Sequence, residues 1–218
     1  MVIATNLLPA GEGDERRLNS FGLSTETFHT GLRPGLSRAA NRTAMALPSS
    51  AGTDIYHDTM EQLALVLADA GWKLVWVDRQ PRLLHPDALI AFTLASGTNV
   101  ANADRRKAPR TRKKGKATRN SLPSSHVEVL PLFDEPDVEQ NATLVAAASL
   151  APLWFLVYER TDRGLNLEFS RPAEMTESGV VVAWEERILI GFLDLDGDLS
   201  MFDNPDNGDF DVPVAPRS

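Results

Sequence analysis

The sequence of 218 residues contains no cysteine, and no stretch of it stays apolar over the roughly 18 residues that a helix needs to cross a bilayer. Without cysteine the chain cannot form disulfide bonds, thiolate zinc sites, iron–sulfur clusters or a cysteine nucleophile. The first residues, MVIATNLLPAGEGDERR, lack the basic start and sustained apolar stretch of a signal peptide. We therefore expect a soluble, cytoplasmic protein that does not contact a membrane.

The motifs of common enzymes are missing as well. The sequence has no G-x-x-x-x-G-K-[ST], G-x-G-x-x-G or G-x-S-x-G pattern, and its four histidines are scattered without an H-E-x-x-H pair. No motif assigns the chain to a family. These absences favour a protein that has no bound cofactor and no catalytic activity.

Positive charge is scarce outside one short segment. The formal net charge is −8, but residues 105–119, RRKAPRTRKKGKATR, carry nine basic residues and no acidic one, so the rest of the chain stands at −17. This basic segment also holds four of the five lysines. Its nine cations are Arg105, Arg106, Lys107, Arg110, Arg112, Lys113, Lys114, Lys116 and Arg119.

The basic segment has no hydrophobic periodicity and its like charges repel one another, which predicts a long mobile loop over residues 97–125. Clustered cations can neutralise phosphates and release counterions, so the leading predicted partner is nucleic acid. The segment has no aromatic residue to stack on bases, so these contacts should be largely independent of nucleotide sequence. An acidic protein, the chain's own acidic end, or no specific partner are the alternatives.

The end of the chain is acidic, because residues 194–211 contain seven aspartates and no basic residue. Their spacing does not match an EF-hand loop, since a loop starting at Asp203 would have Pro205 at its third position. A looser cation site remains as a metal hypothesis, with Asp194, Asp196 and Asp198 as candidate ligands. The acidic tail can instead cover the basic segment by charge attraction, which physiological salt screens over about 8–10 Å.

Apolar spacing predicts a helix over residues 34–47 and a second helix that Asp54 caps and Gly71 closes. The Ala-rich residues 138–150 predict a further helix, and the turn at 161–164 predicts a β-hairpin. Alternating or β-branched stretches predict strands at 72–78, 88–95, 126–132, 153–160, 165–171, 180–184 and 187–195.

These elements predict an α+β fold with a mainly antiparallel sheet, two N-terminal helices, a long basic loop inserted in mid-domain and an acidic C-terminal tail. Residues 1–30 are expected to be mostly irregular, with a short helix around Asp14–Leu18, and residues 31–200 to form a single domain. Residues 201–218 are expected to form the acidic, proline-containing tail.

Two functional hypotheses follow from the charged residues. The leading one is a non-enzymatic nucleic-acid-associated or regulatory protein, whose phosphate contacts would extend to Arg33, Arg38 and Arg42. The second is a metal-dependent phosphodiesterase or nuclease, although no lysine follows Lys116 to complete the usual Asp…Glu-x-Lys pattern. Its candidate residues are His57, Glu168, Asp194 and Asp196.

A third hypothesis is a protein–protein adaptor or assembly subunit, in which charge blocks and strand edges bind other chains. Trp72 and Trp76 share one face of a predicted strand with Leu74, and such a face would be a partner site if exposed. Charged residues near the last strands have a simpler explanation as cross-strand ion pairs on a solvated face. They are Glu168, Arg171, Glu185, Glu186 and Arg187.

Overall fold

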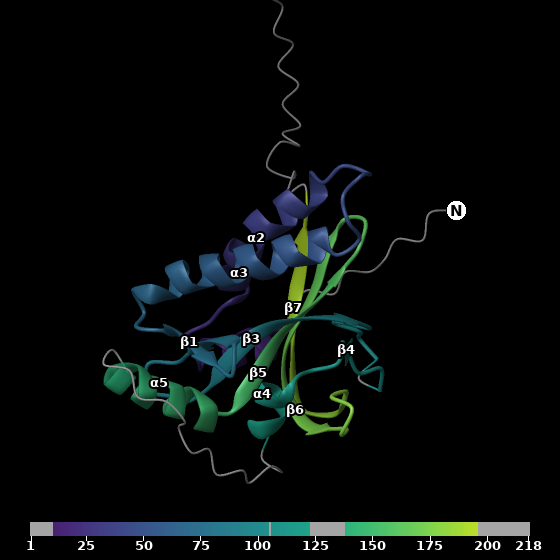
Figure 1. Cartoon of the computed structure of the whole chain (residues 1–218). Coiled ribbons are helices and arrows are strands. Elements are labelled where there is room, and N and C mark those ends of the chain that lie inside the picture. Colours follow the sequence, from purple (N-terminus) through teal and green to yellow (C-terminus); the bar gives the residue numbers. More distant parts are fainter. Residues whose placement is uncertain (1–10, 105, 123–137, 196–218) are drawn as a thin grey trace, which may run out of the picture.

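The computed structural model describes residues 11–104, 106–122 and 138–195. Three helices lie on one face of a central sheet and two lie on the opposite side (Figure 1). The first three are α1 (Glu12–Asn19), α2 (Thr25–Ala40) and α3 (Ser50–Ala68), and the other two are α4 (Lys116–Asn120) and α5 (Val138–Leu150).

The sheet has the strand order β1, β2, β3, β5, β6, β7, and the short strand β4 pairs with the end of β3. Only β3 and β5 pair in parallel, so the predicted α+β fold with a mainly antiparallel sheet is confirmed. A parallel pair needs a long crossover, and this crossover contains the basic segment and α5. The strands are β1 (Lys73–Val77), β2 (Gln80–Leu84), β3 (Ala91–Thr98), β4 (Arg110–Thr111), β5 (Leu153–Arg160), β6 (Gly164–Met175) and β7 (Val181–Asp194).

Aromatic side chains fill the layer between the first three helices and the sheet. The rings of Trp154 and Phe169 stack with their centroids 4.8 Å apart, and Phe28 meets Phe92 edge to face at 6.0 Å. On the opposite face, α5 covers β1 and the start of β3, while the chain that follows β3 packs on β5 and β7. The central strands β3 and β5 are therefore buried on both faces.

The N-terminal part of the chain corrects two predictions. The expectation of a mostly irregular stretch over residues 1–30 is wrong, because α1 extends beyond the short helix expected there and α2 already starts at Thr25. The helix predicted at 34–47 instead spans Thr25–Ala40. α2 packs so closely on α3 that a Cβ at Gly35 would come within 2.9 Å of the Ile55 Cα. Glycine therefore stands at this contact where an apolar side chain would mark the buried face, which weakens the apolar pattern of α2. Residues 1–10 lie outside the described part of the chain.

The second helix also begins earlier than predicted. α3 starts at Ser50, and Asp54 is a buried residue within it, whose carboxylate accepts Arg42 Nε at 2.7 Å and Nη2 at 2.5 Å. The predicted role of Gly71 is confirmed. It follows the helix with a φ of +84°, and its N–H donates to the Ala68 carbonyl at 2.9 Å.

Strand prediction fails at β2, which lies between the strands expected at 72–78 and 88–95. The β1–β2 turn is made by Asp78 and Arg79, whose φ values are 47° and 65°. Such hairpin turns favour glycine, asparagine or aspartate, and Arg79 at the second position is none of these, so the sequence signal is weak. The last two predicted strands form the single strand β7, and the strand expected at 126–132 lies outside the described residues.

The second half of the described chain agrees with the predictions more closely. β5 and α5 have the bounds that were expected at 153–160 and 138–150. The hairpin turn between β5 and β6 is closed by the Thr161 N–H, which donates to the Gly164 carbonyl at 2.9 Å.

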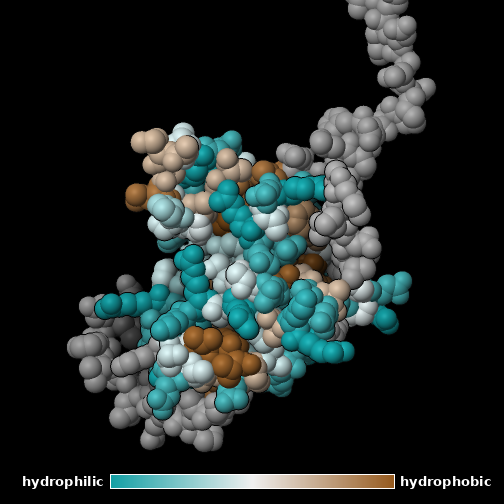
Figure 2. Space-filling view, turned by 90° about the vertical axis from the view of Figure 1, so that its right-hand side faces the viewer, coloured by the Kyte–Doolittle hydropathy of each residue, from teal (hydrophilic) through white to brown (hydrophobic). Residues whose placement is uncertain are grey.

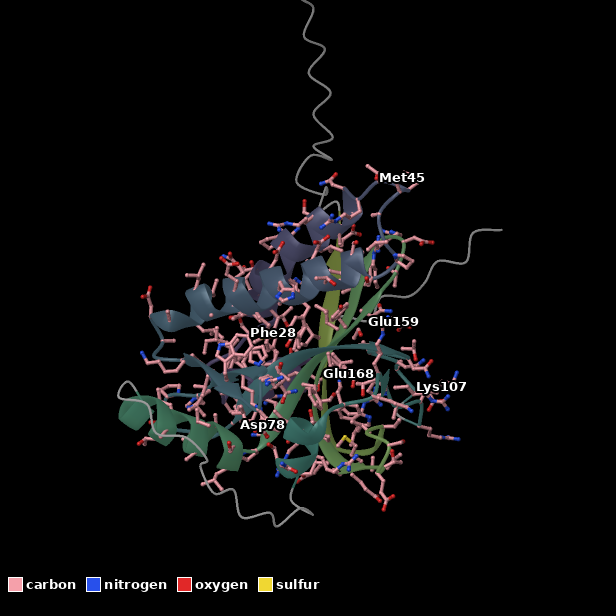
Figure 3. All side chains as sticks on the ribbon, viewed as in Figure 1. Phe28, Met45, Asp78, Lys107, Glu159 and Glu168 are labelled. Atoms are coloured by element: carbon pink, nitrogen blue, oxygen red, sulfur yellow. The ribbon has the colours of Figure 1, made fainter. Side chains whose placement is uncertain are left out.

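Two glutamates anchor the chain where it leaves β3 toward the basic segment. The Glu159 carboxylate accepts the N–H of Val100 at 3.1 Å, and the fully buried Glu168 carboxylate accepts the N–H of Ala101 at 2.9 Å. The Glu168 carboxylate also accepts hydrogen bonds from Arg187 Nη2 at 2.8 Å and from Ser170 Oγ at 2.6 Å. Figure 3 labels both glutamates where β5 and β6 lie beneath this turn.

The basic segment itself is folded onto the sheet. Trp184 Nε1 donates to the Pro109 carbonyl at 3.1 Å, and the Lys114 N–H donates to the Gly179 carbonyl at 2.6 Å. Buried Arg82, whose pKa burial lowers to about 10, donates to Ser121 Oγ at 2.8 Å.

These contacts correct the expectation of a loop without secondary structure over residues 97–125. Its described residues contain β4 and α4, and the side chains of Thr111, Thr118 and Leu122 are buried. The segment shows no periodicity because its buried residues pack singly against the sheet. In the part of the chain that the structure describes, no helix combines the length and hydropathy of a membrane span.

We expect Glu168→Gln to lower the free energy of unfolding by about 3 kcal/mol, because it leaves the buried Arg187 charge without its carboxylate. Glu185→Gln is the matched control, since Glu185 pairs with Arg171 at the surface and such pairs contribute about 1 kcal/mol or less. Urea unfolding followed by tryptophan fluorescence measures both values. Equal effects of the two substitutions would contradict the anchoring role of Glu168.

Candidate anion-binding site

A cavity of about 780 Å³ lies where the N-terminus of α3 meets the ends of β3 and β5 and the start of the basic segment. Four cationic side chains line it, and no acidic residue is among its described lining. They are Arg110, Arg112, Lys114 and Arg160. None of the four forms an ion pair with a carboxylate in the described residues. We call this cavity the cationic pocket.

The N-terminus of α3 adds further positive potential. The first turn of this 19-residue helix contains no acidic residue, and its N-cap, Ser49, makes no side-chain capping bond. Ala51 and Gly52 line the cationic pocket, and no described group accepts their N–H hydrogens. Free N–H groups and the helix dipole favour a bound anion at such an end.

Hydroxyl groups complete the lining. Thr111 is only 7% exposed, and its Oγ1 has no hydrogen-bond partner among the described residues. Tyr158 Oη donates to the Gly52 carbonyl at 3.5 Å, and burial raises the pKa of Tyr158. The pocket therefore presents donors from the helix end, from β4 and from β5.

Lys114 is the most shielded cation of the pocket. Its side chain is half-buried, with Nζ 5.0 Å from the centroid of the Phe155 ring. Burial, and to a smaller degree the neighbouring Arg112, lowers its pKa from 10.5 to about 8. An ammonium group held in this way, without a carboxylate partner, gains from an added anion.

The structure brings three of the nine predicted phosphate-binding cations together in the cationic pocket: Arg110, Arg112 and Lys114. Arg106 and Lys107 are exposed and line a smaller cavity next to β7, which Arg110 also borders. In Figure 3, Lys107 projects at the outer side of the molecule.

The other four cations are not part of the pocket. Lys113 is exposed, and Arg119 donates to the Glu177 carbonyl. Arg105 and the side chain of Lys116 lie outside what the structure describes. Sequence reasoning missed Arg160 and the end of α3, because both lie far from the basic segment in the chain.

The predicted extension of this surface along α2 is only partly available. Arg38 Nε lies 2.9 Å from the Asp58 carboxylate, and Arg42 pairs with Asp54. Arg33 is exposed. Two of the three arginines thus have carboxylate partners within the helical layer.

The candidate metal and nuclease residues do not form a cluster. Asp194 pairs with Arg163 at 3.1 Å, and Glu168 belongs to the buried anchor described above. His57 lines the cationic pocket. Asp196 and Asp198 lie outside the described residues, and within those residues no group of metal-ligating side chains is found.

The expected cross-strand ion pairs are confirmed between β6 and β7. Arg171 pairs with Glu185 at 3.0 Å at the surface, and Arg187 pairs with Glu168. The second pair is buried, so the expectation of a solvated face holds only for the first. Glu186 pairs instead with Arg17 of α1 at 2.6 Å.

The tryptophan face predicted on the first strand is split. Trp72 is buried in the helical layer, whereas Leu74 and Trp76 of β1 are 42% and 59% exposed. β1 is an edge strand, so these two side chains form a small apolar surface.

Figure 2 shows the side of the molecule on which β4 lies, and hydrophilic residues cover most of it around one compact hydrophobic patch.

Comparison with known proteins gives no match: no family model fits the chain, and no curated protein or solved structure is significantly similar to it. The function must therefore be argued from the cationic pocket itself.

The low pKa of Lys114 predicts how stability depends on pH. Between pH 8 and 10.5 the unfolded chain holds the Lys114 proton that the folded protein has released, so stability rises across this interval. Lys114→Met removes the part of this increase in stability that comes from Lys114. Because methionine buries no charge, the variant should be more stable than the wild type at pH 7 by about 1–3 kcal/mol.

Thermal unfolding at pH 7, 8, 9 and 10 measures this difference between Lys114→Met and the wild type. Lys73→Met, at an exposed lysine of β1, is the control and should change neither the stability nor its pH dependence. A Lys114→Met protein that is less stable than the wild type at pH 7 would contradict the prediction.

Proposed function

We propose that this protein is a non-enzymatic nucleic-acid-binding protein of the cytoplasm that holds phosphates in the cationic pocket. The observation that carries the proposal is that four cations, unpaired within the described residues, meet the uncapped end of α3 in one cavity whose described lining contains no acidic residue. Phosphate is the anion that nucleic acids present in a regular array, and its neutralisation supplies much of their affinity for proteins.

The exposed cations outside the pocket support a longer contact. Lys107 and Lys113 belong to the same folded segment and extend its positive charge over the surface, whereas Arg106 Nε lies 3.9 Å from the Asp104 carboxylate. Contacts to phosphates orient a nucleic acid without reading its bases, so we expect weak discrimination between nucleotide sequences.

Protein–protein adaptor function is the second candidate, and the exposed Leu74 and Trp76 on the edge strand β1 favour it. An unpaired strand edge with apolar side chains is a surface on which another chain can add a strand. This candidate predicts association that persists at high salt, whereas phosphate binding weakens as salt increases.

The nucleic-acid proposal is tested with Arg112→Ala/Arg160→Ala, which removes two charges from the pocket. We expect this variant to bind fluorescein-labelled oligonucleotides about tenfold more weakly at 0.1 M salt, and to lower the slope of log K against log salt by about 1–2. Fluorescence anisotropy between 50 and 200 mM salt measures both values.

Arg33→Ala/Lys73→Ala is the control, since it removes the same charge from exposed positions on α2 and β1. Equal binding by the two double variants would mean that the pocket does not hold phosphate. Parallel incubations with Mg²⁺ or Mn²⁺ show whether the oligonucleotide is cleaved, which would support the nuclease hypothesis instead.

A further inference from the structure

We propose that the cationic pocket takes a phosphomonoester, the terminal phosphate of a nucleic-acid strand, in preference to the phosphodiesters within it. This inference rests on the proposed function and names the ligand group of the same site. A free nucleotide carries the same group, so the experiment below separates a strand end from a free nucleotide.

The charge of the pocket fits a dianion better than a monoanion. A phosphomonoester carries about −1.5 to −2 charges at pH 7 and offers three terminal oxygens. An internal phosphodiester carries one negative charge and has only two terminal oxygens. Four cations without a carboxylate among them exceed what one phosphodiester neutralises.

The donors come from several sides of the cavity. Ala51 and Gly52 offer N–H groups from α3, Lys114 offers an ammonium group from the basic segment, and Arg160 offers a guanidinium from β5. Guanidinium forks bind two oxygens of one phosphate at once. The three terminal oxygens of a phosphomonoester can accept more hydrogen bonds from these donors than the two of a phosphodiester can.

The burial of two lining residues points to a group that enters the cavity. Lys114 is half-buried and Thr111 Oγ1 is fully covered, so a phosphate contacts this hydroxyl only by entering the cavity and displacing the atoms that cover it. A phosphodiester continues into the chain on both sides, which keeps it at the surface of a duplex or an extended strand. A terminal phosphate has one covalent link and can enter the pocket.

The unpartnered hydroxyl of Thr111 gives a sharp test. Thr111→Val keeps the shape of the side chain and removes the hydroxyl, so it should raise Tm, because a buried hydroxyl without a partner is unfavourable. The same variant should lose about tenfold in affinity for a phosphorylated strand end. A purely structural threonine would not combine these two effects.

Thr59→Val is the matched control. Thr59 is fully buried in α3, its Oγ1 also has no hydrogen-bond partner among the described residues, and it does not line the cavity. This variant should raise Tm in the same way and leave binding unchanged.

The experiment uses the full chain and one 12-nucleotide strand in three forms: with a 5′-phosphate, with a 3′-phosphate, and with hydroxyls at both ends. We expect a form with a terminal phosphate to bind about tenfold more tightly than the hydroxyl form, and Thr111→Val to remove this preference. Inorganic phosphate and a nucleoside monophosphate serve as competitors and, in calorimetry, as ligands by themselves.

Each outcome separates the inference from the proposed function. Equal binding of all three strands, with Thr111→Val behaving as Thr59→Val, overturns the inference and leaves nucleic-acid binding in place. Binding of the nucleoside monophosphate without binding of any strand supports a phosphomonoester pocket and overturns the proposed function. Binding of no ligand overturns both.

Discussion

The buried carboxylate of Glu168 joins the parts of the molecule on which the cationic pocket depends. It connects β6 to β7 through Arg187, and it fixes the first turn after β3 through the Ala101 N–H. That turn is costly for the backbone, because Ala101 adopts a positive φ of 53°. With the turn held in place, the chain returns as β4 along the end of β3, and the cations of the basic segment reach the end of α3.

The fold separates arginines that have carboxylate partners from cations that have none. Arg17, Arg38, Arg42, Arg163 and Arg171 form ion pairs on the helical layer and the strand ends. The cations of the pocket have no such partner among the described residues, and repulsion between Arg112 and Lys114 opposes folding. A chain with a net charge of −8 can nevertheless present a concentrated positive potential in one cavity, because electrostatic attraction to a ligand depends on local geometry more than on the total charge.

Secondary structure could be predicted wherever one segment forms its own pattern. β5, α5 and the turn between β5 and β6 follow from alternation, alanine content and turn residues. α2 and β2 could not be predicted, because their signals depend on neighbours: α2 packs on α3 through Gly35, and the β1–β2 turn uses Asp78 and Arg79 in a left-handed conformation. Part of the candidate site could be predicted as well, since charge density marks the basic segment from composition alone.

The sequence by itself determined the fold class and the segment in which positive charge is concentrated, because apolar periodicity and clustered charge are local properties. Only the tertiary structure decided which of the nine cations lie together. Arg110, Arg112 and Lys114 share a cavity with Arg160 because the β3–β4 pairing and the parallel β3–β5 pairing bring distant segments to one end of the sheet. Contacts of this kind depend on strand order and register, which no single segment of the chain encodes.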